Sequence, residues 1–201
     1  MKKVLLALLL LFIFSTSSLC FAFDWQTTPP EQKPKLALLY VNNSKTTYDD
    51  EIDKKMNDNF TSLLSNYDII AGTKYVERLN KNGITDITTA ERGDIIDAFK
   101  GEDVDYVLFC EVQPFVRKER ITFFTYGIDM TAIVPIKIID LKTEKYIYNG
   151  KFTEFVSDSS MIGGIGNKSV SMSALDKVIF KMNTIIEARL PLSKHVTPKQ
   201  E

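Results

Sequence analysis

The stretch Ile121–Asp140 alternates between apolar and mixed positions, and this period of two is the strongest β-strand signal in the chain. Pro135 has no amide hydrogen and predicts a sheet edge or a bulge. Asp140–Glu144 predicts a tight turn and Lys145–Val156 a return strand. The chain must therefore fold around a sheet that contains a long β-hairpin. The mostly apolar even-numbered positions include Phe124, Tyr126, Ile128, Met130, Ala132, Val134, Ile136 and Ile138.

Val104–Val112 is the expected central strand of that sheet. Within it, Tyr106–Cys110 is an unbroken apolar run, which is typical of a strand covered on both faces. We expect the strand to continue to about Val116 and to be followed by a charged turn at Arg117–Arg120. This strand would then join a helical first half of the domain to the hairpin.

The remaining elements alternate short apolar runs with helical patterns. The predicted order is β-α-β-α-α-β-β-β-α, an α+β (α/β-like) fold in which helices pack on a mixed β-sheet. Asp49 or Asp50 is expected to cap the first helix, and Thr88 with Glu91 matches a capping box. The other predicted strands are Lys35–Val41 and Tyr67–Ala71, and the predicted helices extend to about Ser65, over Lys74–Asn80, from Thr88 to Lys100 and over Val170–Arg189.

The first 22 residues have the pattern of a secretory signal, since two lysines precede an apolar run, Val4–Phe14, that is too short to span a bilayer. Cleavage is expected after Ala22. Cys20 offers a competing interpretation as the lipidation site of a bacterial lipoprotein, although Leu19 stands where a lipobox has a small residue. We expect an exported protein of the periplasm, the cell envelope or the extracellular space, which meets a membrane only if Cys20 is lipidated.

The predicted domain organisation is simple. Residues 1–22 form the signal peptide, residues 23–34 a proline-rich tether, residues 35–190 a single globular domain and residues 191–201 a flexible tail. Trp25, the only tryptophan, lies in the tether, where it either packs on the domain or anchors a partner.

Charge and cysteine content exclude several functions. Removal of Lys2 and Lys3 with the signal lowers the net charge by two, from −1 to −3, so nothing indicates nucleic acid or an anionic membrane surface as a partner. Without Cys20, Cys110 is the only cysteine and no internal disulfide can form. Its place in the central strand fits a small buried hydrophobe better than a reactive thiol.

No catalytic or metal-binding set is recognisable, and we predict no cofactor. His195 has no second histidine to complete a zinc site, and the tail is a poor position for a Ser-His-Asp base. Gly163–Ser169 fails the Walker pattern because Asn167 separates the glycine from the lysine. Glu111 follows the apolar run of the central strand, and it is either solvated at the end of the sheet or a buried functional acid.

The cluster Phe123-Phe124-Thr125-Tyr126 is more informative. Adjacent residues on a strand point to opposite faces, so one of the two phenylalanines is expected outside the main core. An exposed aromatic side chain beside a charged turn suits a partner surface, whereas helices on both faces of the sheet would bury both rings. The predicted partner surface consists of Phe123, Phe124, Tyr126, Arg117 and Arg120.

Four stretches together resemble a group of secreted bacterial envelope domains. They are KLALLYVNN, YDIIAGTKYVERL, GEDVDYVLFCEV and IKIIDLKTEKYIY, within Lys35–Leu190. The group includes the curli-secretion channel lipoprotein, the lipoprotein activator of a penicillin-binding protein and the N-terminal domain of the Tol-system propeller protein. This chain departs from the group's pattern at Cys110-Glu111, where a small glycine is usual, and at Glu144, where the hairpin has glycine.

The resemblance implies a non-catalytic protein that binds, activates or assembles other envelope proteins. A secreted binding or assembly module that contacts envelope proteins is therefore our first hypothesis. One alternative is a periplasmic small-ligand-binding protein or enzyme whose site uses Glu111 and loop residues near Gly163–Gly166. Another is a homo-oligomer that uses the long Ile121–Asp140 strand as its interface.

Overall fold

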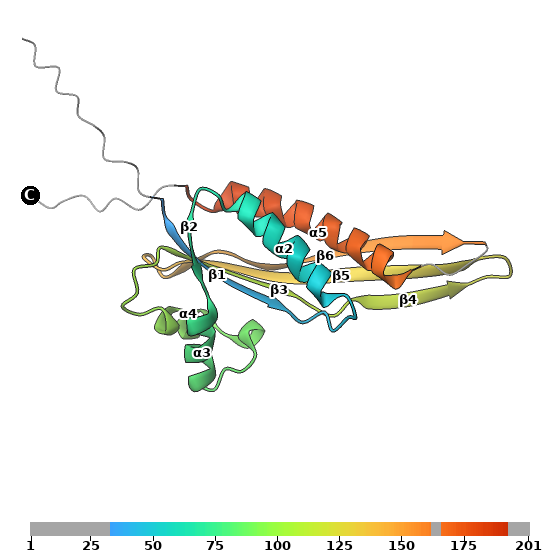
Figure 1. The fold of residues 1–201 in the computed structure, drawn as a ribbon. Helices are drawn as coiled ribbons and strands as arrows, with labels where there is room; N and C mark the ends of the chain where they lie inside the picture. The colour runs from blue at the N-terminus through green and yellow to red at the C-terminus, as the bar shows by residue number, and fades with distance from the viewer. Residues whose placement is uncertain (1–32, 162–165, 193–201) are drawn as a thin grey trace, which may run out of the picture. The chain divides into compact units, whose positions relative to one another are not determined.

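The computed structural model describes residues 33–161 and 166–192, which form six β-strands and four α-helices (Figure 1). The strands are β1 (Lys35–Asn42), β2 (Asp68–Ala71), β3 (Tyr106–Val112), β4 (Val116–Ile121), β5 (Tyr126–Asp140) and β6 (Lys145–Ser160). The helices are α2 (Asp49–Leu63), α3 (Thr73–Lys81), α4 (Arg92–Ala98) and α5 (Asn167–Arg189), with a 3-10 turn at Ile87–Thr89. No helix in these ranges combines the length and the apolar character that a membrane crossing needs.

Several sequence predictions concern residues outside those ranges. The signal segment with Cys20, the tether with Trp25 up to residue 32, the glycines at 163 and 164, and the tail with His195 all lie outside the described residues. They stay predictions.

All six strands belong to one mixed sheet, as predicted. Its order is β2-β1-β3-β5-β4, and β6 pairs with the other side of β5. β1 runs parallel to both β2 and β3, whereas β5 is antiparallel to β3, β4 and β6. The parallel half comes from the alternating first part of the chain and the antiparallel half from the hairpins, which confirms the α+β class.

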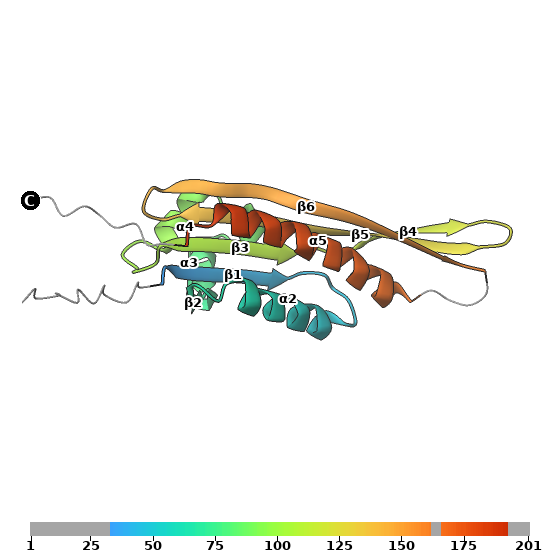
Figure 2. The same cartoon turned by 90° about the horizontal axis from the view of Figure 1, so that it is seen from above.

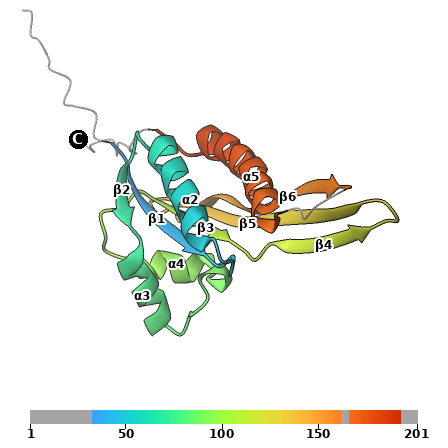
Figure 3. The same ribbon diagram turned by 45° about the vertical axis from the view of Figure 1, so that its right-hand side comes forward.

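The helices cover both faces of the first half of the sheet (Figures 2 and 3). α2 and α5 pack on the face that carries Leu36 and Leu108, and α3 and α4 pack on the face that carries Ala37 and Val107. Every residue of β3 is buried as a result. The unbroken apolar run that predicted a doubly covered strand is thus explained by two helical layers.

α2 and α5 lie side by side and run in the same direction. Residues of α2 contact residues of α5 in ascending order: Lys55 pairs with Asp176, and the amides of Asn59 and Asn183 exchange hydrogen bonds of 3.1 and 2.7 Å. Just before α2, the Tyr48 hydroxyl donates to Ser171 Oγ at 2.9 Å. The C-terminal ends of both helices therefore meet at one end of the domain.

β5 changes partner along its length. Its C-terminal part pairs with β3 and its N-terminal part, Tyr126–Thr131, pairs with β4, while β6 follows its whole other side. Between β3 and β4 the Gln113 backbone N–H donates to Ile133 O at 3.1 Å. The paired part of β3 and β5 ends at Cys110 and Ile136, next to Pro135, which has no N–H to continue that ladder. Of the edge or bulge predicted at Pro135, the bulge is wrong, because the register shift between β5 and β6 lies between Ile138 and Ile139.

Two predicted helix caps are also wrong. The capping box of α4 joins Glu91 to Asp94, whose Oδ2 accepts from the Glu91 backbone N–H at 2.8 Å, in place of Thr88 and Glu91. At α2 the N-cap is Tyr48, and the Asp49 carboxylate instead accepts the Thr46 backbone N–H at 2.9 Å. Hydroxyl donors from the preceding loop lower the pKa of Asp49, so this carboxylate organises the loop before the helix.

The hairpin between β5 and β6 turns at Leu141–Glu144, close to the prediction. Asp140 Oδ1 accepts the backbone N–H groups of Lys142 and Thr143 at 2.9 and 3.1 Å. Glu144 has a φ of 55°, the left-handed conformation that glycine adopts at lowest cost. β6 also extends to Ser160, beyond the predicted end at Val156.

Candidate interaction surface

The turn that joins β4 to β5 places two phenylalanines at the distal end of the sheet. The Thr122 backbone N–H donates to Thr125 O at 2.9 Å, and the Thr125 N–H donates to Thr122 Oγ1 at 3.0 Å. The two threonine hydroxyl oxygens lie 2.6 Å apart and share a further hydrogen bond. The threonines close the turn themselves, so the rings of Phe123 and Phe124 are not needed to hold it.

These two rings belong to a larger apolar patch. Phe123 is 100% exposed and Phe124 82% exposed, and their ring centroids are 6.4 Å apart. Ile121, the last residue of β4, is 75% exposed. Met161, 79% exposed, follows the last residue of β6, which pairs with the first residue of β5. We call Ile121, Phe123, Phe124 and Met161 the tip patch.

Polar contacts brace the strands behind the tip patch. Arg117 Nη2 donates to the Tyr126 hydroxyl at 2.8 Å and lies 2.7 Å from Glu119 Oε1. Arg120 Nε donates to Asp129 Oδ1 at 2.9 Å, and its Nη2 donates to a serine hydroxyl of β6. Both guanidinium groups thus tie neighbouring strands together, and each faces a carboxylate that offsets its charge.

The five residues predicted as a partner surface all lie on the β4–β5 hairpin. Phe123 and Phe124 are both outside the core, where we expected one of them to be. The reason is that they occupy a turn and not a strand, so the alternation between faces does not apply. The three polar or amphipathic members, Tyr126, Arg117 and Arg120, lie on the strands directly behind the turn.

The predicted charged turn at Arg117–Arg120 is wrong. These residues form most of β4, paired with Gly127–Met130 of β5, and the reversal occurs later, at Thr122–Thr125. Sequence reasoning also missed Ile121 and Met161 as exposed apolar residues at the same end of the sheet. The sequence did contain a signal for Ile121, which directly follows the charged run Arg117–Arg120. It contained none for Met161, whose position depends on the pairing of β6 with β5.

Glu111 is the acid on which the alternative ligand-binding hypothesis depends, and most of the loop near Gly163–Gly166 that would complete its site lies outside the described residues. Its side chain is buried, with 2% of the residue exposed, on the central strand. Asn43 Nδ2 donates to Glu111 Oε1 at 3.1 Å, and Gln113 Nε2 lies 3.4 Å from Oε2. Of the two environments expected for this acid, the solvated one is wrong and the buried one is observed, with Asn43 and Gln113 as its hydrogen-bond partners.

Cys110 has the environment of a core residue. It is fully buried, its Sγ lies 4.0 Å from Met182 Sδ, and burial raises the pKa of its thiol. A protonated, enclosed thiol is a poor nucleophile. Within residues 33–161 and 166–192, no three His, Cys, Asp or Glu side chains come together as metal ligands would.

Comparison with known proteins gives structural neighbours only. No protein-family model and no curated protein matches the sequence. Lipoprotein GNA1162 from Neisseria meningitidis is similar, with 12% identity and a TM-score of 0.45 over 75% of this chain and 99% of that one. The C-terminal domain of LpoB from Salmonella enterica has 11% identity and a TM-score of 0.34, over 64% and 87%.

TolB from Acinetobacter baumannii is also similar, with 14% identity and a TM-score of 0.31, over 77% of this chain and 29% of that one. LpoB, a penicillin-binding-protein activator, and TolB, a Tol-system protein, come from the envelope group that the sequence resembles. With TM-scores below 0.5 and identities near one in eight, the likeness supports no conclusion about what this chain binds.

Proposed function

We propose that this chain is a non-catalytic binding module of the cell envelope that holds a partner protein at the tip patch. The observation that carries the proposal is the pair Phe123 and Phe124, two almost fully exposed rings at the end of a braced hairpin. Export to the envelope follows from the predicted signal segment.

The energetics favour a contact surface at this position. Burial of one large apolar side chain is worth roughly 1.5–3 kcal/mol, and the tip patch presents four such side chains together. Clusters of exposed apolar side chains on a soluble domain mark places that other molecules cover. The bracing contacts of Arg117 and Arg120 hold the strands in place before binding, which lowers the entropy lost on association.

The charges behind the patch favour a protein over an anionic lipid surface. Arg117 and Arg120 face Glu119 and Asp129 respectively, so their positive charge is largely offset. Binding to anionic headgroups depends on basic side chains that remain available for the lipid. An apolar patch with a polar, charge-balanced rim is instead the usual anatomy of a protein interface.

The homo-oligomer hypothesis needs the Ile121–Asp140 strand to be available to a second copy. β5 is flanked by β6 on one side and by β3 and β4 on the other, so its backbone offers no long edge for a second copy. Self-association would have to use another surface, such as the tip patch.

The test is cross-linking of the tagged full chain in living cells, followed by identification of the captured proteins. We expect one reproducible envelope protein whose yield falls at least several-fold in Phe123→Ser and Phe124→Ser. Phe180→Ser is the matched control, because Phe180 is 75% exposed but lies on α5, away from the turn.

Equal loss of the captured protein in all three variants would contradict a role for the tip patch. Capture of background proteins alone, with normal export and folding, would contradict the binding-module proposal. Capture of the same chain would identify a homo-oligomer, and binding of the purified protein to phospholipid vesicles, lost in the two tip variants, would favour a membrane instead.

A further inference from the structure

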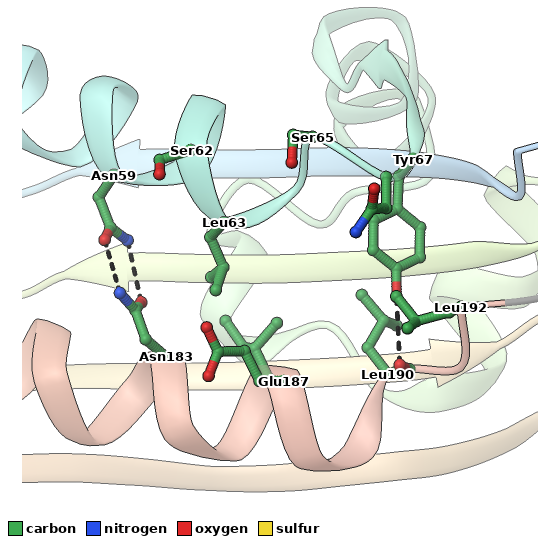
Figure 4. Close-up of a pocket in the computed structure, with 11 residues that line it drawn as sticks. Asn59, Ser62, Leu63, Ser65, Tyr67, Asn183, Glu187, Leu190 and Leu192 are labelled. Atoms are coloured by element: carbon green, nitrogen blue, oxygen red, sulfur yellow. Dashed lines mark hydrogen bonds between the residues drawn. The ribbon is translucent and has the colours of Figure 1, made fainter.

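A second candidate site lies at the opposite end of the domain, between the C-terminal ends of α2 and α5 (Figure 4). It is a cavity of about 360 Å³. Its lining residues come from α2, from α5 and from the segments that follow them. They are Asn59, Ser62, Leu63, Ser65, Asn66, Tyr67, Asn183, Ile186, Glu187, Leu190 and Leu192.

The two helix ends make this cavity electronegative. Because α2 and α5 are parallel, both direct their C-terminal carbonyl groups toward it, and each such end carries roughly half a negative charge. The last turn of α2 contains no basic residue, and only Arg189 stands in the last turn of α5. The amide pair of Asn59 and Asn183 holds the helices together at the wall of the cavity (Figure 4).

Glu187 adds a full negative charge. Among the described lining residues it is the one charged side chain, and it forms no ion pair with any residue that the structure describes. Nearby, Lys33 Nζ donates to the Ser65 backbone carbonyl at 2.7 Å. A lysine of this chain thus already shows that the end of α2 accepts an ammonium group.

The rest of the lining divides into two kinds of surface. Leu63, Ile186, Leu190 and Leu192 supply an apolar side, with Leu192 66% exposed. Ser62, Ser65 and Asn66 supply hydroxyl and amide oxygens beside Glu187. A ligand that matches both surfaces has N–H donors with positive charge at one end and an alkyl chain at the other.

We propose that this cavity binds a primary ammonium group on an aliphatic stem. The group belongs either to a lysine side chain of a partner polypeptide or to a small free amine. In the bound state the ammonium faces the Glu187 carboxylate and the end of α2, and the stem packs on the leucines. This site is separate from the tip patch, so either proposal can fail without the other.

The test is a two-dimensional NMR titration of the full chain with n-butylammonium, and with 1-butanol as the neutral ligand of equal length. We expect saturable shifts at Leu63, Asn66 and Glu187 with the amine, and at least threefold weaker binding of the alcohol. Glu187→Gln should weaken amine binding about three- to fivefold, the size of one solvent-exposed charge pair. Added salt should weaken it too.

Glu77→Gln is the matched control, since Glu77 is an exposed glutamate on α3, on the other face of the sheet. It should leave amine binding unchanged. Equal affinity for the alcohol, shifts that map elsewhere, or unchanged affinity in Glu187→Gln would each overturn the proposal.

A second arm separates the two sources of the ammonium. An acetylated and amidated lysine tripeptide is compared with n-butylammonium under the same conditions. Tighter binding of the peptide, with added shifts on the rim of the cavity, identifies a polypeptide lysine as the ligand. Equal or weaker binding of the peptide identifies a small free amine.

Discussion

β3 and β4 are both antiparallel partners of β5, yet they have opposite environments. All residues of β3 are buried, and all residues of β4 are exposed. The difference comes from the helices, because α2, α5, α3 and α4 cover the β3 half of the sheet and only a small cluster of Ile128, Met130 and Val170 supports the other half. Backbone pairing alone thus extends the sheet, whereas helix packing stabilises it.

The largest expected effect separates two phenylalanines. Phe109 of β3 is 1% exposed and Phe124 of the tip patch is 82% exposed. Phe109→Ala should lower the free energy of unfolding by about 3–5 kcal/mol, because it leaves a cavity in the core. Phe124→Ala should change it by less than about 0.5 kcal/mol. Urea denaturation measures both, and comparable losses would show that the hairpin end contributes to the core.

Two glycines give the next comparison. A methyl group at Gly72, beside β1, would lie 2.6 Å from Leu38 O and 2.8 Å from Leu39 Cγ. Gly72→Ala should therefore cost about 1–3 kcal/mol of unfolding free energy. At Gly127, in the hairpin, the nearest atom would be Asp158 O at 3.2 Å, and alanine should cost less than about 1 kcal/mol. Thermal unfolding of the two variants measures both losses of stability. A larger loss for Gly127→Ala than for Gly72→Ala would contradict the prediction.

The third comparison is between two tyrosine hydroxyl groups. The Tyr67 hydroxyl lies 3.1 Å from both Leu190 O and Pro191 O, whereas that of Tyr126 only accepts from Arg117. Tyr67→Phe should cost about 1 kcal/mol, and Tyr126→Phe less than about 0.5 kcal/mol. Equal costs in chemical denaturation would contradict this ranking.

Tyr67 also predicts a pH dependence. Burial raises the pKa of Tyr67 to about 12 from the usual 10.0. The folded state therefore holds this proton more tightly, and the stabilisation is complete below pH 10 and is lost as the pH rises toward 12. The loss of unfolding free energy over this range should be smaller in Tyr67→Phe. An identical pH profile in the variant and the parent protein would contradict the assignment.

The smallest effect concerns the hairpin's own ion pair. Arg120→Gln removes the contact with Asp129, where the arginine side chain is 56% exposed. Exposed pairs of this kind contribute about 0–1 kcal/mol and weaken as salt is added. We expect a loss below about 0.5 kcal/mol that disappears at high salt. A loss that persists at high salt would contradict this ranking, because it would come from the uncharged part of the Arg120 contacts.

Elements that bury side chains could be predicted from the sequence. β3 is apolar without interruption because helices cover both its faces, and β5 alternates because one face is better covered than the other. β4 could not be predicted in this way. None of its side chains is buried, so its residues carry no burial pattern, and its strand conformation depends on pairing with β5.

The candidate sites likewise contain some residues that the sequence indicates and others that only the fold brings together. Phe123 and Phe124 could be named from the sequence because aromatic pairs beside charges are conspicuous, but the place of Met161 at the same end of the sheet follows only from the pairing of β6 with β5. The capping residues Thr88-Glu91 and Glu91-Asp94 have the same spacing, so the sequence alone does not choose between them. The cavity at Glu187 depends on two helices whose parallel contact only the fold defines.

The pairing of β1 with β3 and of β3 with β5 has a mechanical consequence. β1 begins at one end of the sheet, and the turn between β4 and β5, which carries Phe123 and Phe124, lies at the other end (Figures 1 and 2). A pull between an anchored N-terminus and a partner on the tip patch acts along the strands. The ladder bonds between β1 and β3 and between β3 and β5, which lie across that direction, are then loaded in shear and share the force. The sheet would resist such a pull far better than one that peels its strands apart.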